Sequence, residues 1–246
     1  MARTLLLRGM LVGLAAGLLA FGFAWLVGEP QVRSAIAVEA QALAAAGRQP
    51  APALVGRGVQ STAGLATAVG VYGVALGGLF GLAFAVAYGR IGRFGPRATA
   101  ALLALGGFVA VELVPFLKYP ATPPGAASAD TIGHRTGLYF AMLLLSLLAA
   151  LTAVSLGRRV APRLGNWNAT LLAAGAYVAL VAVTQLALPA VDEVPPGFPA
   201  TLLWRFRLAS LGTQAVLWAT FGLLFGALTE RGLRRATRPR TLQLHR

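Results

Sequence analysis

Long apolar runs, separated by short polar or basic connections, make up most of the chain. An α-helix needs about 20 mostly apolar residues to cross the roughly 30 Å of hydrocarbon in a bilayer. Six runs reach this length, at Leu5–Val27, Gly64–Tyr88, Ala98–Leu117, Thr136–Leu156, Ala169–Leu188 and Leu203–Leu228. The pattern predicts an all-α fold, a polytopic membrane helical bundle of six transmembrane helices, in which residues 1–246 form a single membrane domain.

The connections between the runs refine this arrangement. The first run is too long for the apolar part of a signal peptide, so we expect it to remain as an uncleaved helix. Residues Gln31–Ala46 are rich in alanine and predict a short helix at the membrane surface. Each outer connection returns to the membrane through arginine, which favours three helical hairpins in series. The second and sixth runs share the strings GLFGLAF and GLLFGAL, a weak sign of internal repetition.

The composition excludes most soluble classes of protein. Hydrophobic residues make up 57% of the 246 positions and charged residues only 11%, whereas a soluble domain carries about 25% charged residues. The sequence contains no cysteine, which excludes disulfides, thiolate metal sites and thiol catalysis. It also lacks the motifs of serine hydrolases, metalloproteases and nucleotide-binding loops, so we expect no enzymatic activity.

The net charge of +14 comes from arginines that lie between the apolar runs and in the basic tail, residues 229–246. They follow no amphipathic stripe and have no interleaved aromatic residues, so we do not expect nucleic-acid binding. Basic residues in short connections mark the cytoplasmic side of a membrane protein. We therefore expect both termini in the cytoplasm, together with the following arginines: Arg3, Arg8, Arg90, Arg93, Arg97, Arg158, Arg159 and Arg163.

Glycines recur at a spacing of four residues in three of the predicted helices. This spacing places them on one helix face, where the missing side chains let two backbones approach closely. We expect these faces to pack helix against helix. Sliding surfaces of a transporter and a contact with a partner helix are alternative uses. The glycines are Gly9, Gly13 and Gly17, then Gly73, Gly77 and Gly81, and finally Gly222 and Gly226.

Glu112 is the only acidic residue inside a predicted span. An ionisable group inside a membrane is costly and is a candidate functional residue for that reason. It could coordinate a cation or relay a proton, or it could pair with an arginine such as Arg205 or Arg207. Pro115 lies close to it and should free a backbone carbonyl at a similar depth.

Further oxygen and nitrogen ligands are expected on the outer side. His134, Asp192 and Glu193 join Glu112 as candidate metal ligands, because carboxylates with one imidazole suit a divalent cation of intermediate hardness. Their spacing matches no known metal motif, and solvated loop residues are the plain alternative. Arg205 and Arg207 could also pair with Asp192 or Glu193. Gln185 and Gln214, within the last two runs, could form hydrogen bonds across helices.

The sequence resembles the CbtA family of bacterial proteins, which are predicted subunits of cobalt transporters. The resemblance covers nearly the whole chain and is carried by strings such as VELVPFLKYPATPP, TIGHRT and LPAVDEVPPGFPATLLWRFRLASLGTQ. It implies a multi-pass protein of the bacterial cytoplasmic (inner) membrane that takes up cobalt for cobalamin supply. It also implies a small single-span partner subunit bearing histidines, CbtB.

The resemblance makes the cobalt ion a transported substrate and requires no permanently bound cofactor. Two histidines and three methionines are few for a cobalt transporter, and histidines on a partner subunit would supply the missing ligands. Homo-oligomerisation stays open. Two alternatives are a non-transporting scaffold for a metal-handling partner and a carrier of an anionic solute that uses Arg135, Arg205 and Arg207.

Overall fold

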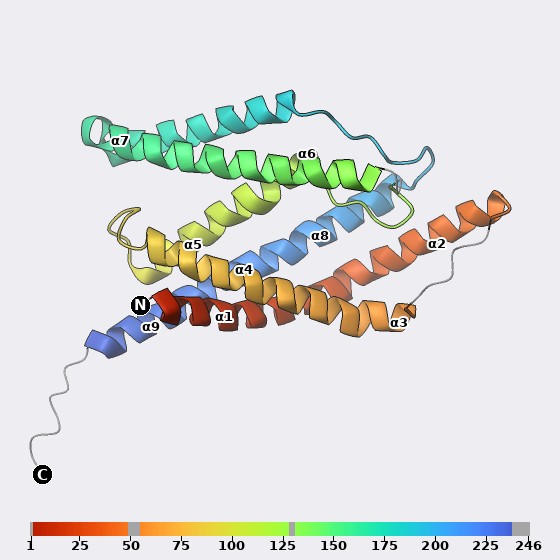
Figure 1. Ribbon diagram of the computed structural model, residues 1–246, viewed down its shortest axis with the longest axis horizontal. Helices are drawn as coiled ribbons and strands as arrows, with labels where there is room; N and C mark the ends of the chain where they lie inside the picture. Colours follow the sequence, from red (N-terminus) through yellow and green to blue (C-terminus); the bar gives the residue numbers. More distant parts are fainter. Residues whose placement is uncertain (1, 49–54, 128–130, 238–246) are drawn as a thin grey trace, which may run out of the picture. The chain divides into compact units, whose positions relative to one another are not determined.

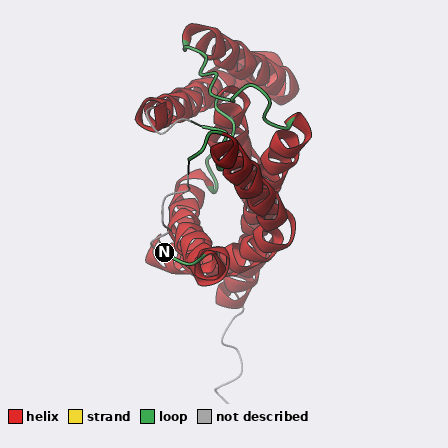
Figure 2. Cartoon of the chain, turned by 90° about the vertical axis from the view of Figure 1, so that its right-hand side faces the viewer, coloured by secondary structure: helices red, strands yellow, loops and turns green. Residues whose placement is uncertain are grey.

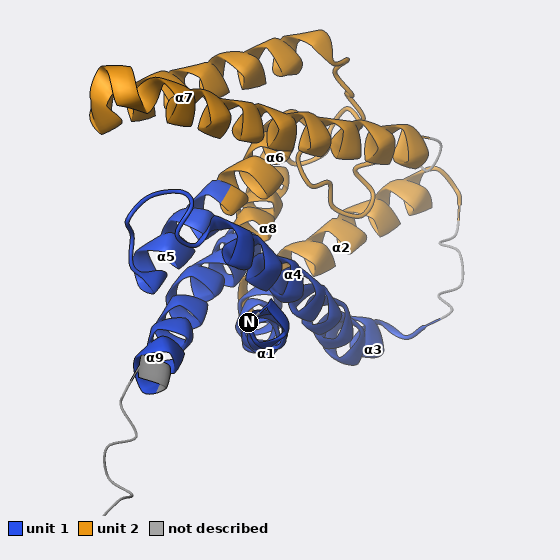
Figure 3. Cartoon of the chain, turned by 60° about the vertical axis from the view of Figure 1, so that its left-hand side comes forward, with its two compact units in different colours: residues 1–25, 53–106, 212–246 blue, residues 26–52, 107–211 orange. Residues whose placement is uncertain are grey.

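A computed structural model describes residues 2–48, 55–127 and 131–237, and the regular secondary structure in these ranges is entirely helical (Figures 1 and 2). The chain forms two compact units, which Figure 3 distinguishes by colour. Unit 1 consists of Met1–Trp25, Ala53–Gly106 and Gly212–Arg246, and unit 2 consists of Leu26–Pro52 and Gly107–Leu211.

Among the described residues, five helices are long and apolar enough to cross a membrane. The six predicted runs fall on these five helices to within one residue, because the fourth and fifth runs share one helix. The tail residues 238–246 lie outside the described part of the chain. The five helices are Ala2–Ala45, Arg57–Ala87, Pro96–Lys118, Ile132–Ala187 and Ala200–Arg235.

Many large apolar side chains are exposed on the helices, and in α1 the buried residues are small. In α1 (Ala2–Phe23) every buried residue is Gly, Ala or Val, whereas Leu11 and Leu18 are 71% and 59% exposed. In water such leucine faces would be driven into a core. In a bilayer the lipid tails solvate them as favourably as the side chains of a protein core would. This distribution indicates a multi-pass membrane protein.

Unit 1 is a group of closely packed helices. Its elements are α1, α3 (Arg57–Val59), the π-helical turn η2 (Gln60–Gly64), α4 (Leu65–Ala87), α5 (Pro96–Gly107), the π-helical turn η5 (Phe221–Phe225) and α9 (Gly226–Thr237).

Facing glycines bring α1 and α4 together as an antiparallel pair. A Cβ atom at Gly9 would overlap the backbone carbonyl of Gly77, and one at Gly13 would overlap that of Gly73. This approach is open only to residues without a side chain, on both helices at once. Gly17 and Gly81 extend the same contact, against Val69 and Leu5 respectively.

The last helix contacts α5 through its own glycines. A Cβ atom at Gly222 would lie 3.0 Å from the Cβ of Ala104, and one at Gly226 would lie 3.1 Å from the Cβ of Ala100. These positions should tolerate a methyl group more readily than the α1–α4 contact, since no atom would lie closer than 3.0 Å to the added Cβ.

Phenylalanines at matching positions pack α4 against η5. The ring centroids of Phe80 and Phe221 lie 5.4 Å apart, and those of Phe84 and Phe225 lie 5.1 Å apart. The segments that carry them read FGLAF at 80–84 and FGLLF at 221–225. The shared strings of the second and sixth runs therefore mark two parallel segments that contact each other.

Unit 2 contains the remaining helices. Its elements are α2 (Glu29–Ala45), the π-helical turn η3 (Phe108–Leu113), α6 (Val114–Lys118), α7 (Ile132–Ala187) and most of α8 (Ala200–Thr220), and the π-helical turn η1 (Ala24–Gly28) joins α1 to α2.

The 56-residue helix α7 is a hairpin of two arms. The backbone of Gly165 has φ 76° and ψ 162°, which no helix contains, and the chain turns back there (Figure 1). Positive φ favours glycine, because other residues bring Cβ too close to the backbone. A hydrogen bond of 2.9 Å between the hydroxyls of Ser146 and Tyr177 joins the arms.

Two predicted connections prove to be helical. The connection between the fourth and fifth predicted runs is helical except for the turn at Gly165, because neither arm needs a longer linker. The predicted surface helix exists as α2, but it continues from α1 without a break. Pro30 does not interrupt that helix, since it directly follows the π-helical turn Ala24–Gly28, where the regular α-helical hydrogen bonding is already altered.

Candidate functional site

Polar side chains of unit 2 gather where α6 ends, where α7 begins and ends, and in the loops that follow. Most of them bond to one another or to backbone carbonyls from distant parts of the chain. This polar cluster consists of Lys118, Tyr119, Thr122, Arg135, Gln185 and Glu193.

Glu112 lies in the same unit, within the π-helical turn η3. It is 6% exposed, and Tyr139 of α7 lies within electrostatic range of its carboxylate. The wider turn precedes Pro115, which cannot donate a backbone hydrogen bond. Single π-helical turns inside α-helices occur frequently at functional sites. The structure therefore places the predicted carboxylate at a buried irregularity of an apolar helix.

Glu193 forms a buried ion pair with Arg135. The Glu193 Oε2 atom lies 3.1 Å from the Arg135 Nη1 atom, and the two side chains are 6% and 25% exposed. The same nitrogen donates to the Thr122 hydroxyl at 2.6 Å. Within the described residues, the second carboxylate oxygen of Glu193 is buried and accepts no hydrogen bond. This carboxylate therefore keeps an unused acceptor in a site shielded from solvent.

Two side chains cross between α6 and the end of α7 in opposite directions. The Lys118 ammonium donates to the carbonyl of Gln185 at 2.6 Å, and the Gln185 amide donates to the carbonyl of Val114 at 3.1 Å. The predicted cross-helix hydrogen bond of Gln185 is thus confirmed. In the described part of the chain, Gln214 differs, because its buried carbonyl oxygen has no hydrogen-bond partner.

Tyr119 fastens the loop that follows α6. Its hydroxyl donates to the carbonyl of Pro189 at 2.8 Å, and the residue is only 4% exposed. Burial raises the pKa of the Tyr119 hydroxyl above the ordinary value of 10.0, so the group keeps the proton that it donates. Sequence reasoning missed Lys118 and Tyr119. The run of Lys, Tyr and three prolines after an apolar helix is the signal that could have drawn attention to them.

The predicted pairing of Glu193 with Arg205 or Arg207 is wrong. Glu193 forms its ion pair with Arg135 instead, and Arg207 donates to the carbonyl of Ala121 at 3.4 Å. Arg205 is exposed. Arg135 lies in the first turn of α7, so it reaches the loop before α8 more directly than the arginines inside α8 do.

His134 and Asp192 are exposed, unlike Glu112 and Glu193. Among the described residues, no three His, Asp or Glu side chains lie close enough together to hold a metal ion. Asp130, another acid predicted on the outer side, lies outside the described residues. The predicted ligands thus comprise two buried carboxylates and two exposed groups rather than one closed coordination sphere.

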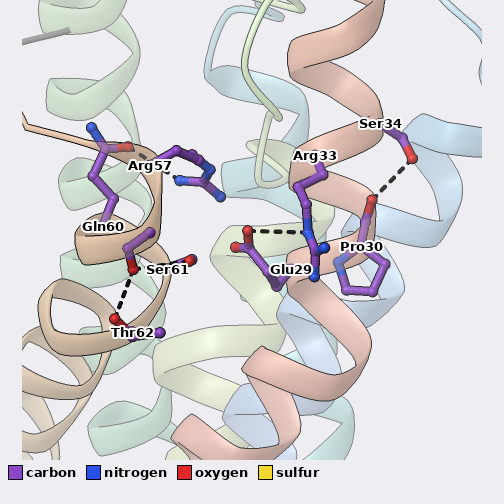
Figure 4. A network of polar contacts seen from close by, with 9 residues as sticks. Glu29, Pro30, Arg33, Ser34, Arg57, Gln60, Ser61 and Thr62 are labelled. Atoms are coloured by element: carbon purple, nitrogen blue, oxygen red, sulfur yellow. Dashed lines mark hydrogen bonds and ion pairs between the residues drawn. The ribbon is translucent and has the colours of Figure 1, made fainter.

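Smaller polar networks lie at the ends of other helices (Figure 4). In unit 2, Glu29 is almost fully buried and pairs with Arg33 one turn along α2, with 3.5 Å between Oε1 and Nε. In unit 1, Arg57 donates to the side-chain carbonyl of Gln60 at 3.2 Å. Both contacts are local, within one helical turn, and they stabilise helix beginnings.

The arrangement offers carboxylates without a fixed metal cage. An ion that must be both captured and released is served by few, weak ligands, whereas a complete coordination sphere would retain it. Most donors of the polar cluster already bond to backbone carbonyls, so its chemically distinctive group is the carboxylate of Glu193. Glu112 adds a second buried carboxylate in the same unit. These features fit a transient site for a cation.

Comparison with known proteins agrees with this chemistry. No curated protein and no solved structure matches the chain significantly. The model of one family, described as probable cobalt transporter subunit (CbtA), matches residues 2–230. Since this match covers nearly all of the 246 residues, the chain belongs to the CbtA family of probable cobalt transporter subunits.

Proposed function

We propose that the chain is the membrane subunit of a system that takes up cobalt, or a related divalent cation, across the bacterial cytoplasmic membrane for cobalamin supply. Membership of a family of transporter subunits supports this proposal, as do the long apolar helices. The cobalt ion is the substrate. A small single-span partner subunit bearing histidines, like CbtB, would supply the nitrogen ligands that the chain itself lacks.

In this proposal the chain crosses the membrane six times and both termini are cytoplasmic. The two arms of α7 make two crossings, and the other four long helices make one each. Reporters fused after Arg240 or inserted at Gly165 should register as cytoplasmic. A reporter within Pro123–Ala129 should register as external. An external C-terminus would reverse the topology.

Glu112 carries the proposal for the pathway. A transported ion loses part of its water shell within the hydrocarbon layer, and a negative charge there offsets that loss. Glu112 is a buried acid at such a position, in an apolar helix opened by a π-helical turn. Glu193 would provide a second carboxylate, and the exposed His134 and Asp192 would make the first contacts with the ion.

The test is cobalt uptake in a bacterial host that lacks its own cobalt importers, with the chain expressed alone and with its partner subunit. Glu112→Gln removes the charge and keeps the shape, and uptake should fall at least about tenfold at unchanged membrane abundance. Glu230→Gln is the matched control, since Glu230 pairs with Arg97 and Arg234 in unit 1. That variant should retain uptake.

Other outcomes identify other functions. Full uptake by Glu112→Gln would remove this carboxylate from the pathway. Loss of abundance in the same variant would make Glu112 a structural residue. If the chain never increases uptake but raises the abundance of its partner, it is a scaffold rather than a transporter.

A further inference from the structure

A basic pocket lies between the beginning of α1 and α9 in unit 1. Figure 1 shows these two segments near each other. The volume of the pocket is about 680 Å³, which is within the usual range for small-molecule sites. Nine residues line it, namely Arg3, Thr4, Leu7, Arg8, Leu11, Leu228, Arg231, Gly232 and Arg235. Four of the nine are arginines, and none is acidic.

Within the described residues, no acidic side chain balances the positive charge of this pocket. Glu230, the acid of α9, pairs with Arg97 and Arg234, which lie outside the pocket. In the part of the chain that the structure describes, none of the four pocket arginines forms an ion pair. Gathered guanidinium groups repel one another, so a bound anion would stabilise the arrangement.

Gly232 contributes to the shape of the pocket. A Cβ atom at this position would lie 2.6 Å from the Nη2 atom of Arg8. The missing side chain therefore lets the Arg8 guanidinium lie directly against α9. Arg3 and Thr4 lie in the first turn of α1, where backbone N–H groups lack partners within the helix. An anion in the pocket would meet hydrogen-bond donors as well as charge.

Basic and apolar residues occupy successive levels along the two helices. α1 runs antiparallel to α4, and α4 runs parallel to η5, which leads into α9, so α1 and α9 run in opposite directions. Arg8 contacts Gly232, and Leu11 and Leu228 therefore lie on the same side of the arginines. Leu11 follows Arg8 by three residues, or about 4.5 Å along the axis. Leu11 and Leu7 are 71% and 49% exposed.

We propose that this pocket binds an anionic phospholipid, with the lipid phosphate at the arginines and an acyl chain along the leucines. Guanidinium groups bind phosphate through paired, charge-assisted hydrogen bonds. A free phosphate ion would use the basic level alone and gain nothing from exposed leucines. A phospholipid uses both levels, at the depth where its headgroup joins its chains.

The experiment uses the purified full-length chain in neutral detergent. Phosphatidylglycerol, phosphatidylcholine and inorganic phosphate are titrated separately, and binding is measured by native mass spectrometry and by the shift in thermal unfolding. Phosphatidylglycerol should bind and raise the unfolding temperature, whereas phosphatidylcholine and phosphate at the same concentrations should not. The double variant R8Q/R231Q should weaken phosphatidylglycerol binding at least roughly tenfold.

Matched variants separate this site from general attraction of lipid to a basic protein. R158Q/R159Q removes the same charge from exposed arginines of α7 and should bind like the wild type. Leu11→Ser should weaken lipid binding without creating phosphate binding. Equal losses in the two double variants would overturn the proposal, and so would phosphate binding as tight as that of the lipid.

Discussion

Units 1 and 2 hold their helices together by opposite means. In unit 1 the closest contact depends on side chains that are absent, as where Gly9 of α1 faces Gly77 of α4. In unit 2 the contacts depend on side chains long enough to reach a distant carbonyl, as Lys118 reaches Gln185. The first unit is fastened by backbone proximity and the second by polar groups.

The difference follows from how the backbone N–H and C=O groups of each unit find hydrogen-bond partners. A continuous helix bonds its own N–H and C=O groups, so the α1–α4 contact of unit 1 gains its stability in lipid from close packing. Helix ends and loops leave carbonyls without partners. Unit 2 contains such carbonyls at Gln185, Pro189 and Ala121, and a side chain donates to each of them.

Because the α1–α4 contact of unit 1 depends on facing glycines, adding a side chain at one of them should lower stability more than any other single substitution. Gly77→Leu places a branched side chain against the backbone of Gly9 and Gly13. We expect loss of most folded protein, because overpacking against rigid backbone costs about 3 kcal/mol or more. Yield and thermal unfolding in detergent measure this.

Gly70→Leu is the control on the same helix, since a Cβ atom at Gly70 would meet nothing within 4 Å. It should fold nearly as well as the wild type. Equal damage from both substitutions would mean that helix propensity, rather than the α1–α4 contact, limits stability.

In unit 2 the largest loss of stability should come from removing one partner of the Arg135–Glu193 ion pair, which leaves the other charge unpaired. Arg135→Met removes the partner of the buried Glu193 carboxylate and should lower the free energy of unfolding by about 3 kcal/mol. The double substitution Arg135→Met with Glu193→Met should recover most of that loss. A double variant no more stable than the single one would show that the pair is not the source of the effect.

The Lys118 bond should matter less. Lys118→Met keeps the apolar stem and removes the charged donor to the Gln185 carbonyl. The expected loss is about 2 kcal/mol, typical of a hydrogen bond to a charged group. Thermal unfolding of the variant is compared with that of Arg93→Met, which changes an exposed arginine of unit 1. An equal loss of stability in both variants would mean that the effect of Lys118→Met comes from the loss of a surface charge and not from the hydrogen bond.

Tyr119→Phe should have the smallest effect, about 1 kcal/mol, because it removes one neutral hydrogen bond. The folded state raises the pKa of this hydroxyl above 10.0. Its contribution is therefore complete below pH 10.0 and is lost as the pH rises through the raised pKa. Unfolding of the variant and the wild type should converge in that alkaline range, and a constant difference would contradict the assignment.

The sequence predicted the helices and their glycine faces better than the polar contacts. Apolar length and a spacing of four residues are local properties, so Gly9, Gly13, Gly73 and Gly77 could be placed on faces from the sequence alone. Contacts such as Tyr119 with Pro189 join residues 70 positions apart. They depend on how helix ends meet in space, which no local pattern encodes.

The pairing of Arg135 with Glu193 illustrates the same limit. Several arginines could reach that carboxylate by charge alone, and the chosen one depends on where α7 begins. The π-helical turn at Glu112 also escaped prediction, because nothing but a nearby proline marks it in the sequence. The expectation that Pro115 frees a carbonyl near Glu112 pointed to an irregular backbone, but not to a π-helical turn that contains the carboxylate itself.

The hairpin of α7 has a consequence for the biogenesis of the protein. Its arms pack closely near the turn, where a Cβ atom at Gly157 would lie 3.0 Å from the Cβ of Ala173. The arms are joined at Gly165 without a separate linker, so neither arm could insert into the bilayer independently of the other. In the proposed topology we expect the two arms to enter the membrane together during synthesis, with the arginines near Gly165 kept on the cytoplasmic side. Substitutions at this turn should lower insertion rather than transport.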